Sequence, residues 1–175
     1  MGSPSGSDFQ FLAENSADII CRFGMDRRLH YVSPSSVHIL GWTPDEMIAY
    51  VDRLYAATGA GDWETASQMV TDDFFITEAE DMPMAGTYHG MEGFQDLFTK
   101  VMGMCDVAAL DRVETTAGKD HAVAILSFRF ADPSLAPAEL CEVFRFRDGK
   151  CCQIKPFYYD AAPFWAAVNA KTAAA

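Results

Sequence analysis

The sequence has few basic residues, no long apolar run and no cysteine pair at metal-ligand spacing. Its 13 lysines and arginines stand against 25 aspartates and glutamates, giving a formal net charge of -12. Nucleic acid phosphates and anionic membrane surfaces are bound by clustered positive charge, which this chain lacks. No apolar stretch approaches the length of a membrane span. The composition therefore argues against nucleic acid and membrane partners.

Cysteine and histidine are also sparse in the patterns that metals require. The 5 cysteines are odd in number and show no C-x-x-C spacing, so neither a disulfide framework nor a zinc site is predicted. The four histidines are scattered, and neither a glycine-rich phosphate loop nor a nucleophile motif is found. We therefore expect no cofactor and no metal. Unpaired cysteines favour a reducing, cytoplasmic location.

What the sequence does have is enough apolar material for a core. Half of its 175 residues are hydrophobic, which is typical of one or two folded domains. The first eight residues, MGSPSGSD, have no signal-peptide pattern and are predicted to be a flexible leader. Residues 171–175 are predicted to be a disordered tail.

The N-terminal part contains a hairpin pattern. In ADIICRFGMDRRLHYVS two extended runs flank a turn, and VHILGW then has the pattern of a short helix ended by Gly41. The segment ENSADIICRFGMDRRLHYVSPSSVHILGWTPDEMI resembles the opening strands and small helices of a PAS sensor domain. The resemblance covers residues 9–46 and stops there. The long helix and the strands that line a PAS cavity do not follow, so this fragment is incomplete and not an autonomous domain.

A helix is predicted to begin where that resemblance ends. Thr43 and Glu46 form a capping-box pattern, with Pro44 at the first helical position. Apolar residues then recur at helical spacing as far as Thr58 and Gly59. One helix therefore crosses the junction, and we interpret the chain as a chimera of a PAS fragment and a different fold. The alternative is a natural domain with an N-terminal hairpin extension.

The rest of the chain predicts helices followed by strands. A second helix is capped by Asp62, FFITEAED (74–81) is a strand, and a third helix opens at Gly90. Strands follow at residues 110–117, 121–130, 139–147 and 151–159, with a terminal helical turn after them. Helices grouped before an antiparallel sheet indicate the α+β class.

Residues 47–170 resemble the SnoaL-like branch of the nuclear transport factor 2-like superfamily, which includes ketosteroid isomerases and polyketide cyclases. The most diagnostic pieces are Gly61-Asp62, the segment Gly-Thr-Tyr-His-Gly at 86–90, and the Asp-Gly-Lys turn at 148–150. The resemblance implies a cone-shaped, curved antiparallel sheet packed on helices, a cystatin-like roll with an apolar cavity. It also implies a homodimer formed through the outer face of the sheet.

Two acids are the candidate catalytic residues. Proton transfer in such a cone requires a carboxylate in apolar surroundings, where desolvation raises its pKa toward neutrality. Counted back from Gly90, Asp81 falls at the position of the ketosteroid isomerase general base, and Glu78 matches a recurrent acidic position of SnoaL-like sequences. The alternative is that these acids are solvated charges at the end of a strand.

Six further residues are candidates for ligand binding. Glu142 alternates with apolar residues on its strand, which indicates an inward position, although it could instead pair with Arg129 or Arg145. Leu54 falls at the position of the isomerase tyrosine, with Tyr55 one residue away, and Glu139 falls at the position of the second isomerase acid. The full set is Tyr55, Met84, Tyr88, Glu139, Glu142 and Tyr158.

The sequence thus predicts a domain that binds an apolar small molecule and acts as a cofactor-independent isomerase or cyclase with a carboxylate base. The alternative is a non-catalytic protein, either a ligand-binding or dimerisation module or an engineered chimera without selected activity. A working PAS sensor is a third hypothesis, weakened by the missing strands.

Overall fold

The structure, a computed structural model, describes residues 21–23, 29–32 and 43–174, and divides the chain into two units, Met1–Trp42 and Thr43–Ala175. In the first unit, strands β1 (Cys21–Phe23) and β2 (Leu29–Val32) pair antiparallel, as the hairpin pattern predicts. The leader and the short helix predicted for VHILGW lie outside the described residues. So does most of the PAS-like fragment.

The second unit begins with helix α3 (Pro44–Gly59), which confirms the predicted start and end. The Glu46 amide donates to Thr43 Oγ1 at 3.3 Å, and the Thr43 amide donates to Glu46 Oε2 at 2.9 Å, so the capping box is complete. Met47, Val51 and Leu54 lie on the buried face of α3. A short helix, α4 (Trp63–Gln68), follows, and its cap Asp62 accepts from the Thr65 amide at 3.0 Å.

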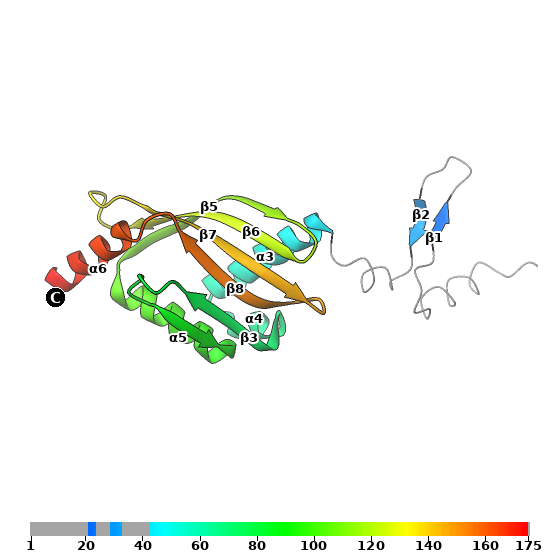
Figure 1. Cartoon of the computed structure of the whole chain (residues 1–175), viewed down its shortest axis with the longest axis horizontal. Coiled ribbons are helices and arrows are strands. Elements are labelled where there is room, and N and C mark those ends of the chain that lie inside the picture. Colours follow the sequence, from blue (N-terminus) through cyan, green and yellow to red (C-terminus); the bar gives the residue numbers. More distant parts are fainter. Residues whose placement is uncertain (1–20, 24–28, 33–42, 175) are drawn as a thin grey trace, which may run out of the picture. The chain divides into compact units, whose positions relative to one another are not determined.

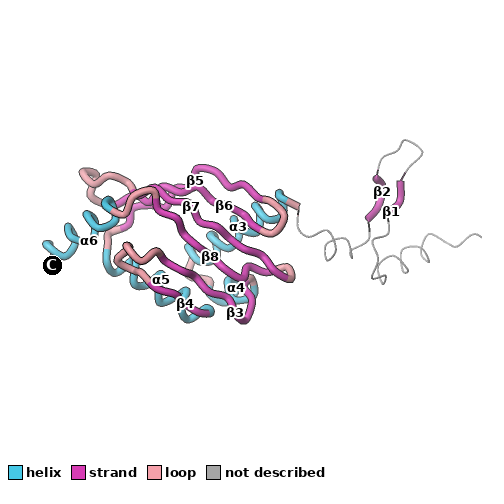
Figure 2. The backbone as a smooth tube through the Cα atoms, in the orientation of Figure 1, coloured by secondary structure: helices cyan, strands magenta, loops and turns pink. Residues whose placement is uncertain are grey.

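Six strands form one sheet in the order β4-β3-β8-β7-β6-β5 (Figure 1). They are β3 (Val70–Glu78), β4 (Gly86–His89), β5 (Val107–Ala117), β6 (His121–Phe130), β7 (Ala138–Arg147) and β8 (Lys150–Tyr158). Register shifts interrupt the β5–β6 and β7–β8 pairings. Such bulges increase the local bend and twist of a strand, and the long strands run side by side as a curved sheet (Figure 2).

The sheet is mixed rather than fully antiparallel, which corrects one part of the sequence prediction. The hairpin β3–β4 and the meander β5–β8 are each antiparallel, but β3 and β8 pair in parallel at their junction. The α+β class and the cystatin-like roll are confirmed. A pattern of strands does not reveal which strand lies beside which, so the parallel pair was not predicted.

Two elements also differ from the prediction. The segment Gly86–His89, for which the sequence predicts no strand, pairs with β3 as β4. Helix α6 (Ala162–Ala174) is 13 residues long, whereas a terminal turn followed by a disordered tail was predicted. Its alanines are good helix formers, and Phe164 anchors it in the core with no exposed surface.

Two helices cover different parts of the sheet. Helix α3 contacts β5 and β6, while helix α5 (Gly90–Met104) contacts β3 and β4. Between them, Phe74, Leu126 and Phe144 are among the most deeply buried side chains. This arrangement leaves a space above the middle of the sheet. None of the helices in the described ranges is long and apolar enough to cross a membrane.

Candidate functional site

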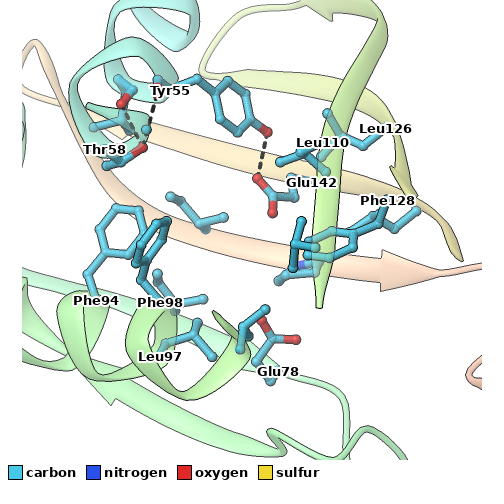
Figure 3. Close-up of a pocket in the computed structure, with 18 of the residues that line it drawn as sticks. Tyr55, Thr58, Glu78, Phe94, Leu97, Phe98, Leu110, Leu126, Phe128 and Glu142 are labelled. Carbon is cyan, nitrogen blue, oxygen red and sulfur yellow. Dashed lines mark hydrogen bonds between the residues drawn. The ribbon is translucent and has the colours of Figure 1, made fainter. Parts of the chain in front are cut away.

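A cavity of about 600 Å³ lies between α3, α5 and the concave side of the sheet. Its wall is largely apolar, with phenylalanines from α5, β6, β7 and α6 and aliphatic side chains from every long strand. Figure 3 shows Phe94, Leu97, Phe98 and Phe128 around this space. Cavities of this size and polarity hold small organic molecules in many proteins.

One polar pair crosses the cavity from helix to sheet. The Tyr55 hydroxyl on α3 donates to Glu142 Oε2 on β7 at 2.6 Å, although the two residues are 87 positions apart (Figure 3). Glu142 occupies the inward side of β7, where Leu140 and Phe144 also line the cavity. This contact answers the alternative raised for Glu142, because its hydrogen-bond partner is Tyr55 rather than Arg129 or Arg145.

A second polar pair lies within the sheet itself. Tyr158 Oη on β8 donates to Glu78 Oε2 at the end of β3, at 3.0 Å. The parallel β3–β8 pairing carries both residues into the cavity wall. Glu78 is only 6% exposed and is the one buried acidic residue of the described chain. The site therefore has two tyrosine–glutamate pairs in one apolar space.

Burial gives these four groups unusual acidities. Desolvation raises the pKa of Glu78 from its ordinary 4.5 to about 7; the neighbouring Glu142 adds to the rise and the Tyr158 hydrogen bond opposes it. Desolvation likewise raises the pKa of Glu142, against the Tyr55 hydrogen bond. The pKa values of Tyr55 and Tyr158 are raised first by desolvation, so both hydroxyls remain protonated donors.

Such a carboxyl group can both accept and return a proton at neutral pH. A general base or acid works best when its pKa lies near the working pH, because both protonation states are then populated. Glu78 meets this condition. A tyrosine hydroxyl has one hydrogen, so Tyr55 or Tyr158 can polarise an oxygen of a bound molecule by turning away from its glutamate. The arrangement is chemically suited to moving a proton within an apolar ligand.

The cavity opens between α3, α5 and β5. Asp52 on α3 and Arg112 on β5 both line it and form an ion pair there. Phe98, Met102 and Leu110 also line the cavity but are exposed to solvent. Large exposed apolar side chains beside a cavity are typical of a binding site. We call these five residues the rim.

Three of the sequence-predicted site residues lie outside the cavity. Asp81 is exposed, because the turns between Ala79 and Ala85 direct Met82 and Met84 inward instead. Glu139 is exposed on β7, one residue out of phase with the inward Leu140. Tyr88 donates to the Met84 carbonyl at 2.7 Å and accepts from Lys100 Nζ at 3.1 Å, on the outside of α5. None of these three residues lines the cavity, which differs from their predicted places in the site.

Five of the predicted site residues do meet in the cavity wall. They are Tyr55, Glu78, Met84, Glu142 and Tyr158. Sequence reasoning missed the rim residues Asp52 and Arg112. The signal was present for Arg112, since it alternates with Leu110 on a strand and the two side chains share a face. No cluster of three or more metal-binding side chains is found in the described ranges.

Comparison with known proteins identifies a family for the second unit. Residues 51–154 match the family model described as SnoaL-like domain. No match was found among curated proteins. The family match does not extend to residues 9–46, and the resemblance of that segment to a PAS domain stays a prediction.

Solved structures share the fold at low sequence identity. An NTF2-like protein from Burkholderia xenovorans LB400 has a TM-score of 0.63 and 20% identity, over 74% of this chain and all of its own. TerC, co-crystallised with polyporic acid, has a TM-score of 0.60 and 18% identity, over 70% of this chain and 97% of its own. A protein with a cystatin-like fold from Xanthomonas campestris has a TM-score of 0.55 and 20% identity, over 67% and 96%.

Proposed function

The chain belongs to the SnoaL-like family, and from this premise we propose that its cavity binds an apolar small molecule and moves a proton within it without a cofactor. The observation that carries the proposal is the pair of tyrosine-bound carboxyl groups, Glu78 and Glu142, in one apolar cavity. TerC, which shares this fold, was co-crystallised with polyporic acid, and this supports an organic ligand for the cavity.

Glu78 is the proposed base. Of the two candidate catalytic acids, it is the one in the cavity wall, and its pKa of about 7 lets it take and return a proton at neutral pH. Tyr158 holds its carboxyl group in place, while Tyr55 and Glu142 supply a donor for a carbonyl oxygen of the ligand. Proton removal beside a carbonyl, followed by return or ring closure, is the reaction class of an isomerase or cyclase.

The proposal is tested by exchange of ketone protons. Alpha-tetralone, a neutral bicyclic ketone, is incubated with the protein in deuterium oxide, and loss of its alpha-proton signal is followed by proton NMR. The wild-type protein should accelerate exchange, and Glu78→Gln should reduce this acceleration by about a hundredfold or more. Thermal unfolding with and without tetralone reports binding separately, since a bound ligand stabilises the folded state.

Asp81→Asn is the matched comparison, because it neutralises the other candidate acid at an exposed position. It should leave exchange unchanged. If Asp81→Asn abolished exchange and Glu78→Gln did not, the base would be Asp81 and the assignment to Glu78 would be wrong. Stabilisation by tetralone without any exchange would remove the catalytic part of the proposal.

A second candidate function is ligand binding without turnover. It is favoured by the exposed positions of Asp81 and Glu139, which match two acids of the isomerase pattern but do not reach the cavity. The same pair of experiments separates the two candidates, because only the catalytic one predicts exchange.

We also propose that the chain forms a homodimer through the convex face of its sheet. Cys141 on β7 lies directly between Ile125 on β6 and Phe157 on β8, so these three form one apolar row. Phe157 is 51% exposed and Ile125 is 39% exposed. Exposed apolar side chains gathered on the outer face of a sheet favour a protein partner. Cys105, Cys141, Cys151 and Cys152 are free, which supports the cytoplasmic location that we propose.

A further inference from the structure

The rim carries the one positively charged side chain among the described residues that line the cavity. Arg112 projects from β5 beside Leu110, and its guanidinium carbon lies 5.9 Å from the centre of the Tyr55 ring. Its Nη1 donates to Asp52 Oδ1 on α3. Arg112 therefore stands between solvent and the Tyr55–Glu142 pair.

The ion pair that holds Arg112 is accessible to a competitor. The Arg112 side chain is 36% exposed and the Asp52 side chain is 44% exposed. Solvent-exposed ion pairs contribute little free energy, and exchanging one carboxylate partner for another therefore costs little. The guanidinium also has five N–H donors in a planar fork, of which Asp52 uses one. A ligand carboxylate at the rim can therefore bind the guanidinium in a bidentate manner, through two parallel hydrogen bonds.

The inner part of the cavity has the opposite character. Glu78 and Glu142 supply the acidic groups there, and desolvation and their mutual repulsion favour the neutral, protonated form of Glu78. A ligand carboxylate placed beside them would lose its hydration and gain no cation in return. The distribution of charge thus allows an anionic group at the rim and disfavours it within.

The three apolar rim residues form a surface that the apolar part of a ligand can cover. Phe98, Met102 and Leu110 are exposed, yet they continue directly into the apolar cavity wall. Apolar area removed from water here contributes to binding in proportion to its extent. A molecule that filled the cavity and ended at Arg112 would cover all three.

We propose that Arg112 is a specificity-determining residue that selects an apolar organic acid, with its carboxylate on the guanidinium in place of Asp52 and its apolar body in the cavity. This inference rests on the proposed function and names the class of ligand for the same site. Asp52 acts as the resident partner that a ligand carboxylate displaces.

The test uses probes that share one ring system and differ in one group. Naphthylacetic acid, its methyl ester and naphthylethylamine are titrated into the full chain at about pH 8, and binding is measured by calorimetry. The acid should bind about tenfold more tightly than the ester, as expected for one charge-assisted contact. The amine should bind no better than the ester.

Three variants test whether Arg112 is the residue responsible for the preference for the acid over the ester. Arg112→Gln should bring the acid to the affinity of the ester, whereas Asp52→Asn should strengthen binding of the acid about threefold or more, because its competitor is gone. Arg129→Gln is the matched control: Arg129 on β6 forms another exposed ion pair, with Asp111 on β5, but neither residue lines the cavity. It should leave the preference for the acid unchanged.

The outcomes distinguish this inference from the proposed function. Equal affinity of acid and ester, unaffected by Arg112→Gln, would overturn the selection of an acid while leaving cavity binding in place. Tighter binding of the amine would assign selectivity to the inner carboxyl groups and would also overturn it. Failure of all three probes and of tetralone to bind would overturn the proposed function itself.

Discussion

The position of Glu78 at the end of β3 determines the acidity of its carboxyl group. In the unfolded chain its carboxyl group is solvated and has the ordinary pKa of 4.5, whereas in the folded protein burial raises that pKa to about 7. Between these two values the folded state binds more protons than the unfolded state, so the free energy of unfolding must fall as pH rises. Above about pH 7 the Glu78 contribution levels off.

This reasoning predicts how stability depends on pH. Urea unfolding followed by tryptophan fluorescence should show stability falling from about pH 4.5 to about pH 7, and Glu78→Gln should make that fall shallower by a total on the order of 3 kcal/mol. Part of the slope should remain, because burial also raises the pKa of Glu142. Identical slopes for the variant and the wild-type protein would contradict the burial of an ionisable Glu78.

The acidity of Glu78 should respond in opposite directions to changes at its two neighbours. Glu142→Gln removes a negative charge that raises the pKa of Glu78, so that pKa should fall. Tyr158→Phe removes a hydrogen bond that stabilises the ionised form, so the same pKa should rise. Carbon NMR titration of labelled glutamate carboxyls measures both. Shifts of the same sign in the two variants would show that the contacts are misassigned.

At the level of elements, the close packing of helix α5 against the sheet depends on Gly93. A Cβ atom added to Gly93 would lie 2.8 Å from the backbone carbonyl carbon of Tyr88, closer than such atoms approach in proteins. Tyr88 belongs to β4, so the missing side chain lets the helix approach the strand. The cavity wall made by Phe94, Leu97 and Phe98 is placed by this contact.

Gly93→Ala should therefore destabilise the protein by about 1–3 kcal/mol, even though alanine is the better helix former. Gly103→Ala is the matched control on the same helix, because nothing lies within 4 Å of its added Cβ. That variant should be unchanged or up to about 1 kcal/mol more stable. Thermal or urea unfolding of both variants checks the pair, and a stabilising Gly93→Ala would argue against the close packing of α5 on β4.

The elements differ in how far their sequences predict them. Local signals were sufficient for α3 and for the start of α4, because Thr43, Glu46 and Asp62 interact with residues three positions away. The strand β4 was missed because its four residues are held by pairing with β3 rather than by their own pattern. The extension of α6 was missed because Phe164 packs against Phe128 and Phe130, which are far away in the sequence.

The site residues also divide into those that a local sequence pattern predicts and those that only the folded structure places. Glu142 was placed by the alternation of residues along a strand, which is a local property. Asp81 was placed by counting from Gly90, and the count could not show that the turns after Ala79 direct Met82 and Met84 inward. The pairing of Tyr55 with Glu142 depends on the distance between α3 and β7. The distance between the two elements cannot be derived from the spacing of residues in the sequence.

At the scale of the whole molecule, the two faces of the sheet differ in what covers them. The concave face is occupied by the cavity and its helices, and we propose that a partner subunit covers apolar area on the convex face. On that face Ile125, Cys141 and Phe157 form a row across β6, β7 and β8. Leaving this row in water costs free energy that pairing with a second copy recovers.

Sedimentation velocity should accordingly find a dimer of the wild-type chain, and Phe157→Asp should shift it to monomer, because a charge buried in an apolar interface has no partner. Thr99→Asp adds the same charge on an exposed position of α5, on the cavity side of the sheet, and should leave the dimer intact. Far-ultraviolet circular dichroism should be unchanged in both variants, since neither position is buried. A monomeric wild-type chain, or a dimer that withstands Phe157→Asp, would show that this face does not mediate assembly.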